Sequence, residues 1–260
     1  MVRGLRIACW NLGGANHHGS NQYRAAAIQR LSWEALVDQG SDIILVQEAV
    51  FSAVELPAGW RQSRKEAPHG WGSLIAVGPD VEFDARWRPE SPVLAAYGSY
   101  LAFGRVRRLN SDWINVVSVH APEDRFGWEQ AGRRDPLPRG STRPWSSDLI
   151  LDALVPTSGA RIFGGDWNEA RSYTQGGRAA GVRDFFDRTA AAGLIDPVIE
   201  TFGSEVRTVF LPNRPSIYQN DHLFVSDEIW RAAGRCWVIG HCDPPGQLSD
   251  HAMTVLELNV

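Results

Sequence analysis

Polar and ionisable side chains follow several apolar, strand-like stretches of this sequence, and they are of the types that bind metal ions and transfer protons. These residues are Asn11, Glu48, Asp166, Asn168, Asp221, Asp250 and His251, in the segments Trp10-Asn11, Gln47-Glu48, Gly165-Asp166-Trp167-Asn168, Asn220-Asp221-His222 and Ser249-Asp250-His251. Acidic, amide and imidazole groups gathered at strand ends predict a metal-dependent site that hydrolyses phosphate esters.

Glu48 is the first candidate metal ligand. A carboxylate at the end of a buried strand is unfavourable unless it is paired or bound to a metal, and Mg²⁺ prefers one or two carboxylates together with water and substrate oxygens. Asn11 could position Glu48 or the metal, and Asp250 could act on the metal side of the site. We therefore predict a Mg²⁺ site, with Mn²⁺ as a second possibility. The alternative is a glutamate that faces solvent at the end of its strand.

Asp166 and Asn168 are two residues apart, so in an extended segment their side chains point the same way. The aspartate could orient or deprotonate the attacking water, and the amide could hold that water or a phosphoryl oxygen. The alternative is a plain turn, because glycine, aspartate and asparagine favour turns.

His251 is predicted to stabilise the transition state. A histidine held by a carboxylate keeps one tautomer and a raised pKa, so it can donate to a phosphoryl oxygen. We choose Asp221 as that carboxylate, and His120, at the end of another strand-like stretch, could contact the phosphate. The alternatives are a helix cap or loop at Ser249-Asp250-His251 and a core or capping role for His120.

The elements that must position these residues alternate along the chain. Apolar runs predict strands over residues 5–10, 42–46, 72–77, 100–106, 113–119, 161–165, 222–225 and 252–258, and helical spacing predicts helices over 23–37 and 182–192. In the first helix the apolar positions Ala27, Ile28, Leu31, Ala35 and Leu36 define the expected buried face. Because the candidate site residues interleave along the whole chain, we expect one α/β domain over residues 1–260.

Composition and motifs exclude several classes of protein. The net charge of −4 gives no overall basic field, no apolar run approaches the roughly 20 residues that cross a bilayer, and the first residues lead into a strand rather than a signal peptide. Three cysteines favour a reducing cytoplasm over a disulfide framework. A Gly-x-Ser-x-Gly elbow and a phosphate-binding Gly-x-x-x-x-Gly-Lys loop are both absent from the sequence.

A long irregular segment over residues 121–145 combines arginines with aromatic residues. Arg133, Arg134 and Trp128 are its candidate substrate-binding residues, because arginines contact phosphates and aromatic rings stack on bases. Acidic residues such as Glu129 and Asp135 dilute this charge, so a solvated surface loop is the alternative.

In order and spacing, the segments from Asn11 to His251 resemble those of the endonuclease/exonuclease/phosphatase superfamily. The resemblance implies a four-layered α/β sandwich, in which two mixed β-sheets pack face to face and are flanked by helices. It also implies that Glu48 is the principal metal ligand with Asn11 beside it, and that Asp166 acts on the water. His251, held by Asp221, would then contact the phosphate.

Three departures bear on the substrate. Ala49-Val50 follow Glu48 where exonuclease III-like enzymes usually have Thr-Lys, His120 stands where they have tyrosine, and Gln219 stands where many members have arginine. We therefore expect a monomeric phosphoesterase whose leading substrate is nucleic acid. The alternatives are a phosphatase or phosphodiesterase for a small phosphorylated metabolite or phospholipid head group, and a binding domain without catalysis.

Overall fold

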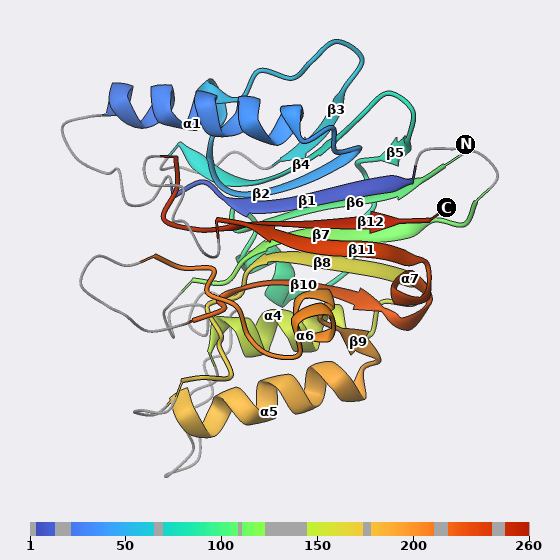
Figure 1. Cartoon of the computed structure of the whole chain (residues 1–260). Helices are drawn as coiled ribbons and strands as arrows, with labels where there is room; N and C mark the ends of the chain where they lie inside the picture. The colour runs from blue at the N-terminus through green and yellow to red at the C-terminus, as the bar shows by residue number, and fades with distance from the viewer. Residues whose placement is uncertain are drawn as a thin grey trace.

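Two six-stranded β-sheets pack on each other and form the body of the described part of the chain (Figure 1). The computed structural model describes residues 4–13, 22–64, 70–108, 111–122, 145–173, 178–210, 218–240 and 248–259. The first sheet has the order β11 (Ala233–Ile239), β12 (Met253–Leu258), β1 (Leu5–Asn11), β2 (Ile43–Val50), β4 (Trp71–Val77) and β3 (Arg61–Arg64). The second has the order β5 (Glu82–Asp84), β6 (Leu101–Arg107), β7 (Ile114–His120), β8 (Ala160–Asp166), β10 (Asp221–Ser226) and β9 (Leu194–Ile195).

Both sheets are mixed, and each contains a parallel pair. Strands β1 and β2 are parallel in the first sheet, as are β7 and β8 in the second, and the remaining pairs are antiparallel. Parallel neighbours end at the same edge of a sheet, so Asn11 lies opposite Gln47, and His120 lies opposite Asp166. This pairing gathers the candidate site residues at one edge of the sandwich.

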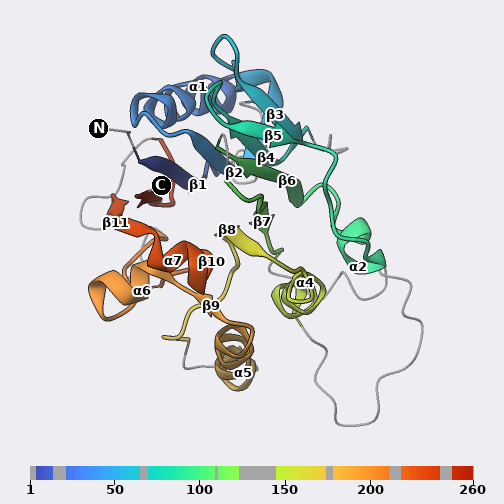
Figure 2. The same cartoon turned by 90° about the vertical axis from the view of Figure 1, so that its right-hand side faces the viewer.

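Helices cover the outer faces of both sheets (Figure 2). Helix α1 (Gln22–Asp38) lies on the first sheet, whereas α4 (Ser146–Leu154) and α5 (Arg178–Ala191) lie on the outer side of the second. The shorter helices are α2 (Pro92–Ala96), α6 (Pro197–Phe202) and α7 (Asp227–Arg231), and a 3₁₀ turn, η2, covers Phe51–Ala53. The four layers confirm the predicted α/β sandwich. None of the helices in the described ranges is long and apolar enough to cross a membrane.

The alternation of side chains along the strands builds three apolar layers. In β2, Ile43 and Leu45 point into the core between the sheets, whereas Ile44 and Val46 pack under α1. In β8, Phe163 points outward to the layer that α4 and α5 cover. The continuous apolar runs read from the sequence reflect strands that are buried on both faces.

The predicted strands are all present, with ends shifted by a few residues, but several elements were not predicted, and the buried face of one helix was predicted wrongly. Not predicted were the strands β3, β5, β9 and β11 and the helices α2, α4, α6 and α7. In β11 the polar Arg235 and the exposed Gly234 interrupt the apolar pattern. The buried face of α1 is rotated from the predicted one. Leu31 is 54% exposed, whereas Gln29 and Ser32 are buried together with Trp33 and Leu36.

The backbone of Gly165 lies too close to β7 to leave room for a Cβ, and this yields a first prediction. Its φ is 152°, and a Cβ built on it would lie 1.7 Å from the carbonyl oxygen of Val119 on β7. We expect Gly165→Ala to lower the free energy of unfolding by about 3 kcal/mol, through backbone strain and the clash together. Urea unfolding measures this loss.

The matched control is Gly203→Ala, at a glycine with φ of 74° and no heavy atom within 4 Å of its added Cβ. There only the left-handed backbone is unfavourable for alanine, so about 1 kcal/mol should be lost. Equal losses in the two variants would contradict the close approach at Gly165.

Candidate active site

Three strand ends of the second sheet place their site residues side by side. Strand β7 pairs with β8 so that His120 lies opposite Asp166, and β10 pairs with β8 so that Asp221 lies opposite the same residue. All three side chains are buried. Asp166 is therefore the central member of a row that runs across neighbouring strands.

The first sheet contributes Asn11 and Glu48 to the same place. The Nδ2 of Asn11 donates to Glu48 Oε1 at 3.3 Å and to Asp166 Oδ2 at 3.0 Å. Its Oδ1 accepts the backbone N–H of Gly13 at 2.9 Å, which fixes the orientation of the amide. The side chain of Asn11 thus joins carboxylates that come from the two opposite sheets.

Glu48 and Asn168 are the two residues other than glycine with positive φ in the described ranges, at 52° and 53°. Glu48 Oε1 lies 3.5 Å from His120 Nε2. The backbone N–H of Asn168 donates to Asp166 Oδ1 at 3.1 Å, and its side-chain amide donates to the carbonyl of Ala121 at 2.9 Å. Strained backbone of this kind persists where the surroundings enforce it, and it clusters at functional sites.

His251 and Asp221 form a buried pair. Nδ1 of His251 lies 2.9 Å and 3.1 Å from the two carboxylate oxygens of Asp221, which only accept, so Nδ1 donates. Nε2 lies 4.0 Å from both Asp166 Oδ2 and Asp250 Oδ1. The backbone around His251 is fixed by Trp10 Nε1, which donates to the carbonyl of His251 at 2.8 Å. The imidazole therefore presents Nε2 to the group of carboxylates.

Burial and the charges of neighbouring groups together shift the pKa values of Asp166 and His251. Burial, together with the nearby carboxylates of Asp221 and Glu48, raises the pKa of Asp166 to about 8 against the opposing effects of His251 and of the hydrogen bond from Asn168. For His251, burial alone would lower the pKa, but the charge and hydrogen bond of Asp221 hold it well above the usual value. The carboxyl groups of Glu48, Asp166 and Asp221 thus lie together in one buried place beside the imidazolium of His251. Further positive charge there would be favourable.

The donor set fits a divalent cation. Glu48, His120 and Asp166 each offer a ligand atom within 4.8 Å of the others, as do Asp166, Asp221 and His251. In the second group the imidazole is already hydrogen-bonded to Asp221. The first group is therefore the better candidate metal site, with Glu48 and Asp166 as its carboxylate donors. Hard oxygen ligands of this kind suit Mg²⁺ and Mn²⁺.

The structure brings together most of the residues that the sequence singled out. Buried and in one place are Asn11, Glu48, His120, Asp166, Asn168, Asp221 and His251. Asp250 lies at the rim, with 29% of its side chain exposed, and it belongs to neither group of clustered donors among the described residues. Arg133, Arg134 and Trp128 lie outside the described residues.

Sequence reasoning missed several residues that support the site. Asn220 donates to Asn168 Oδ1 at 3.3 Å and accepts from the hydroxyl of Tyr173 at 2.7 Å. His222, on the other face of β10 from Asp221, lies 2.6 Å from Asp196 and 2.9 Å from the carbonyl of Glu169, which follows Asn168. Asn220 and His222 flank Asp221 in the sequence, and this position is the signal that could have pointed to them.

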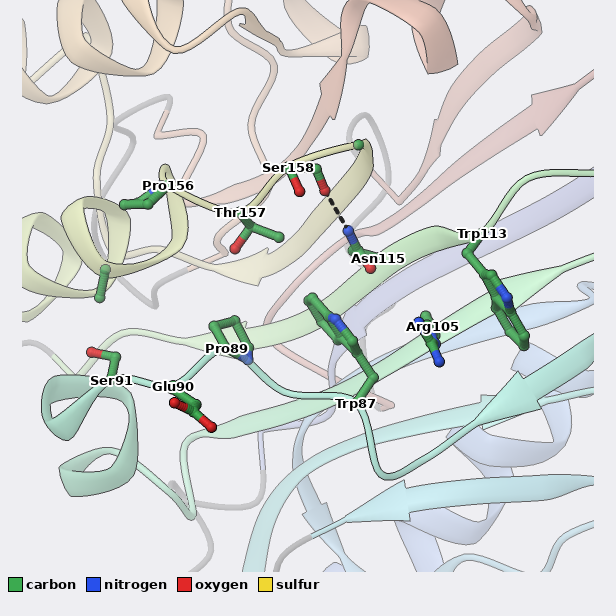
Figure 3. A pocket seen from close by; sticks show the side chains of 12 residues that line it. Trp87, Pro89, Glu90, Ser91, Arg105, Trp113, Asn115, Pro156, Thr157 and Ser158 are labelled. Atoms are coloured by element: carbon green, nitrogen blue, oxygen red, sulfur yellow. Dashed lines mark hydrogen bonds between the residues drawn. The ribbon is translucent and has the colours of Figure 1, made fainter.

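A separate hollow of about 670 Å³ lies away from this cluster (Figure 3). Its lining includes Trp87, Arg105 and Trp113, together with Asn115 near the start of β7 and Gly159 just before β8. His120 and Asp166 lie at the far ends of the same two strands. The hollow is therefore not part of the candidate active site.

Comparisons with known proteins support the fold. No protein-family model matches the chain, and no curated protein matches its sequence. Among solved structures it is similar to the AP endonuclease LMAP from Leishmania major, at 15% identity and a TM-score of 0.67 over 98% of this chain and 88% of that one. It is also similar to D. rerio TDP2 complexed with single strand DNA product, at 15% identity and a TM-score of 0.65 over 98% and 99% of the two chains.

A third similar structure is the 3' phosphatase NExo from Neisseria bound to product DNA hairpin, at 17% identity and a TM-score of 0.60 over 98% and 100% of the two chains. These likenesses extend over nearly the whole chain, and they agree with the two mixed sheets and the flanking helices. The chain shares the α/β-sandwich fold of these three structures.

Proposed function

We propose that this chain is a Mg²⁺-dependent phosphodiesterase that hydrolyses nucleic acid. The observation that carries the proposal is the buried convergence of Glu48 and Asp166, from opposite sheets, beside the Asp221–His251 pair. Burying so many carboxylates is unfavourable for a purely structural site. Their arrangement supplies the parts that phosphoester hydrolysis requires.

Each residue has a role that follows from its contacts. Asp166 is held at both oxygens, by the backbone of Asn168 and the amide of Asn11, so its carboxylate has a fixed direction from which it orients and deprotonates the attacking water. His251, protonated and held by Asp221, donates from Nε2 to a phosphoryl oxygen. Asn168, held by Asn220, positions the phosphate, and His120 contacts it from the neighbouring strand.

Glu48 and Asp166 would hold the divalent cation, with His120 as the third donor of the group, Asn11 beside them and Asp250 at the rim. When bound, the cation supplies positive charge to the phosphoryl oxygens and lowers the pKa of the water. The same positive charge would support the ionised form of Asp166, whose pKa is otherwise raised to about 8 by burial and by the carboxylates of Asp221 and Glu48.

Nucleic acid is the preferred substrate because two of the similar structures, those of NExo and D. rerio TDP2, hold DNA products. Arg133, Arg134 and Trp128 remain its proposed binding residues. The alternative, a phosphatase or phosphodiesterase for small phosphorylated molecules, is favoured by the similarity to NExo, which is a 3' phosphatase. The proposed enzyme is a monomer, and its proposed cytoplasmic location rests on the sparse cysteines.

Hydrolysis of a mixed panel tests the proposal. The panel contains single- and double-stranded DNA, RNA, an aryl phosphodiester and phosphorylated metabolites, each with Mg²⁺, Mn²⁺ or a chelator. Cleavage of a polynucleotide that a chelator abolishes is the expected result. Turnover confined to small phosphates would favour the alternative, and binding without any turnover would favour a non-catalytic domain.

Asp166→Asn gives the first prediction for the reaction. The amide keeps the size of the side chain but cannot take a proton, so the rate of hydrolysis with saturating Mg²⁺ should fall on the order of 10²–10³-fold or more. Asp80→Asn, at an exposed carboxylate beyond β4, is the matched control and should keep the wild-type rate. A fully active Asp166→Asn variant would remove Asp166 from the chemistry.

Asp221→Asn should change the pH dependence as well as the rate. The charge of Asp221 raises the pKa of His251, so the wild-type imidazole stays protonated well above pH 6.5. Without that charge the pKa of His251 falls, and the protonated donor is lost at a lower pH. In the variant, kcat/KM should therefore decline from a lower pH than in the wild type, and an unchanged profile would contradict the pairing.

A further inference from the structure

One buried side chain of α1 binds the backbone at the ends of two strands. Gln29 is fully buried. Its Nε2 donates to the carbonyl of Glu48 at 2.8 Å and to that of Leu12 at 3.3 Å, and its Oε1 accepts the N–H of Val50 at 2.7 Å. These backbone groups belong to the segment that contains the candidate metal ligand Glu48 and to the residue that follows Asn11.

At Glu48 strand β2 departs from regular geometry. The pairing of β2 with β4 shifts between Val46 and Ala49, and Glu48 itself has a left-handed φ of 52°. A left-handed backbone is unfavourable for a residue with a side chain, and it is kept only when other contacts enforce it. Gln29 provides such contacts, because it binds the carbonyl of Glu48 and the N–H of Val50 on either side of Ala49.

The irregularity changes the direction of the Glu48 side chain. Along β2, Leu45 points into the core between the sheets and Val46 points toward α1. Gln47 again faces the second sheet, where its Nε2 donates to Ser118 Oγ at 2.8 Å. Regular alternation would turn Glu48 back toward α1. Instead its carboxylate lies 3.5 Å from His120, two residues beyond Ser118 on the same strand.

We propose that Gln29 is a positioning residue for the metal site. It holds the left-handed conformation of Glu48, and this conformation places two successive side chains of β2 on the same side of the strand. The inference rests on the proposed function, because it assumes that Glu48 binds the cation. Gln29 itself touches neither cation nor substrate; it acts through the backbone of Glu48.

Affinity for Mn²⁺, measured on the metal-free protein by the electron paramagnetic resonance signal of the free ion, tests this role without using activity. Gln29→Met is nearly the same size but removes all three hydrogen bonds. We expect it to weaken Mn²⁺ binding about 10–100-fold, the range typical of residues that orient metal ligands. Glu48→Gln should weaken binding at least as much.

The double variant separates positioning from general loosening of the fold. If Gln29 acts through Glu48, then Gln29→Met should cause no further loss of Mn²⁺ affinity in a Glu48→Gln background. The matched control is Asn115→Leu, which removes a buried amide that donates to the carbonyl of Ser158 at 2.8 Å, at the other end of β7 (Figure 3). This control should lower the urea midpoint but leave Mn²⁺ affinity unchanged.

Each contrary outcome has its own meaning. Wild-type affinity in Gln29→Met, together with weak binding in Glu48→Gln, would overturn the role of Gln29 alone. An equal loss from Gln29→Met in both backgrounds would show general loosening and would also overturn it. Undiminished binding in Glu48→Gln would refute the metal site of the proposed function, and the inference would fail with it. If Gln29→Met does not fold, Gln29→Glu replaces it, because it keeps the acceptor for Val50 but loses the donor to Glu48.

Discussion

The amide of Asn11 is the contact on which the arrangement of the site depends. It donates to Glu48 of the first sheet and to Asp166 of the second, two carboxylates that would otherwise repel each other in a buried place. Its own oxygen is bound to Gly13, so the amide cannot turn away from either carboxylate. The apolar core between the sheets sets their separation, and that separation is what one asparagine side chain can span.

The second support of the site is a buried pair behind it. His222 lies within hydrogen-bond distance of Asp196 and of the carbonyl that follows Asn168. Burial alone would lower the pKa of His222, but the hydrogen bond and the charge of Asp196 raise it. The left-handed conformation of Asn168 is therefore held from both sides, by Asp166 in front and by His222 behind. Asp221 and His222, neighbours on β10, thus support the site from opposite faces of the second sheet.

Much of the fold and of the candidate site could be predicted because the relevant signals are local. Strands buried on both faces appear as apolar runs, and a polar residue directly after such a run marks the end of the regular part of the strand, as Asn11 does in β1 and Glu48 does where the pairing of β2 shifts. Parallel pairing then brings these ends to one edge. Asn220 and His222 flank Asp221 in the sequence, but their contacts, such as that of His222 with Asp196, could not be predicted, because they join segments far apart in the chain and depend on which strands pair.

Helix α1 shows where periodicity gives the wrong answer. The prediction placed Leu31 on the buried face, yet Leu31 is exposed and Gln29 is buried. A helix that covers regular strands buries apolar side chains, whereas the segment under this part of α1 presents backbone carbonyl and N–H groups outside the regular ladder. Leaving buried backbone groups without partners is more unfavourable than exposing one leucine. The helix is therefore rotated to place an amide there.

Because the site lies across the two sheets, binding of an ion there would also stabilise the packing of one sheet on the other. Glu48 and Asp166 belong to different sheets, so an ion held by both acts as a noncovalent crosslink between them. The free energy of binding then adds to the free energy of separating the sheets, by mass action. Amide protons deep in both sheets, remote from any ligand, would exchange with solvent more slowly in the bound protein. Binding of an ion at the site would thus be detectable by slower amide exchange throughout the core.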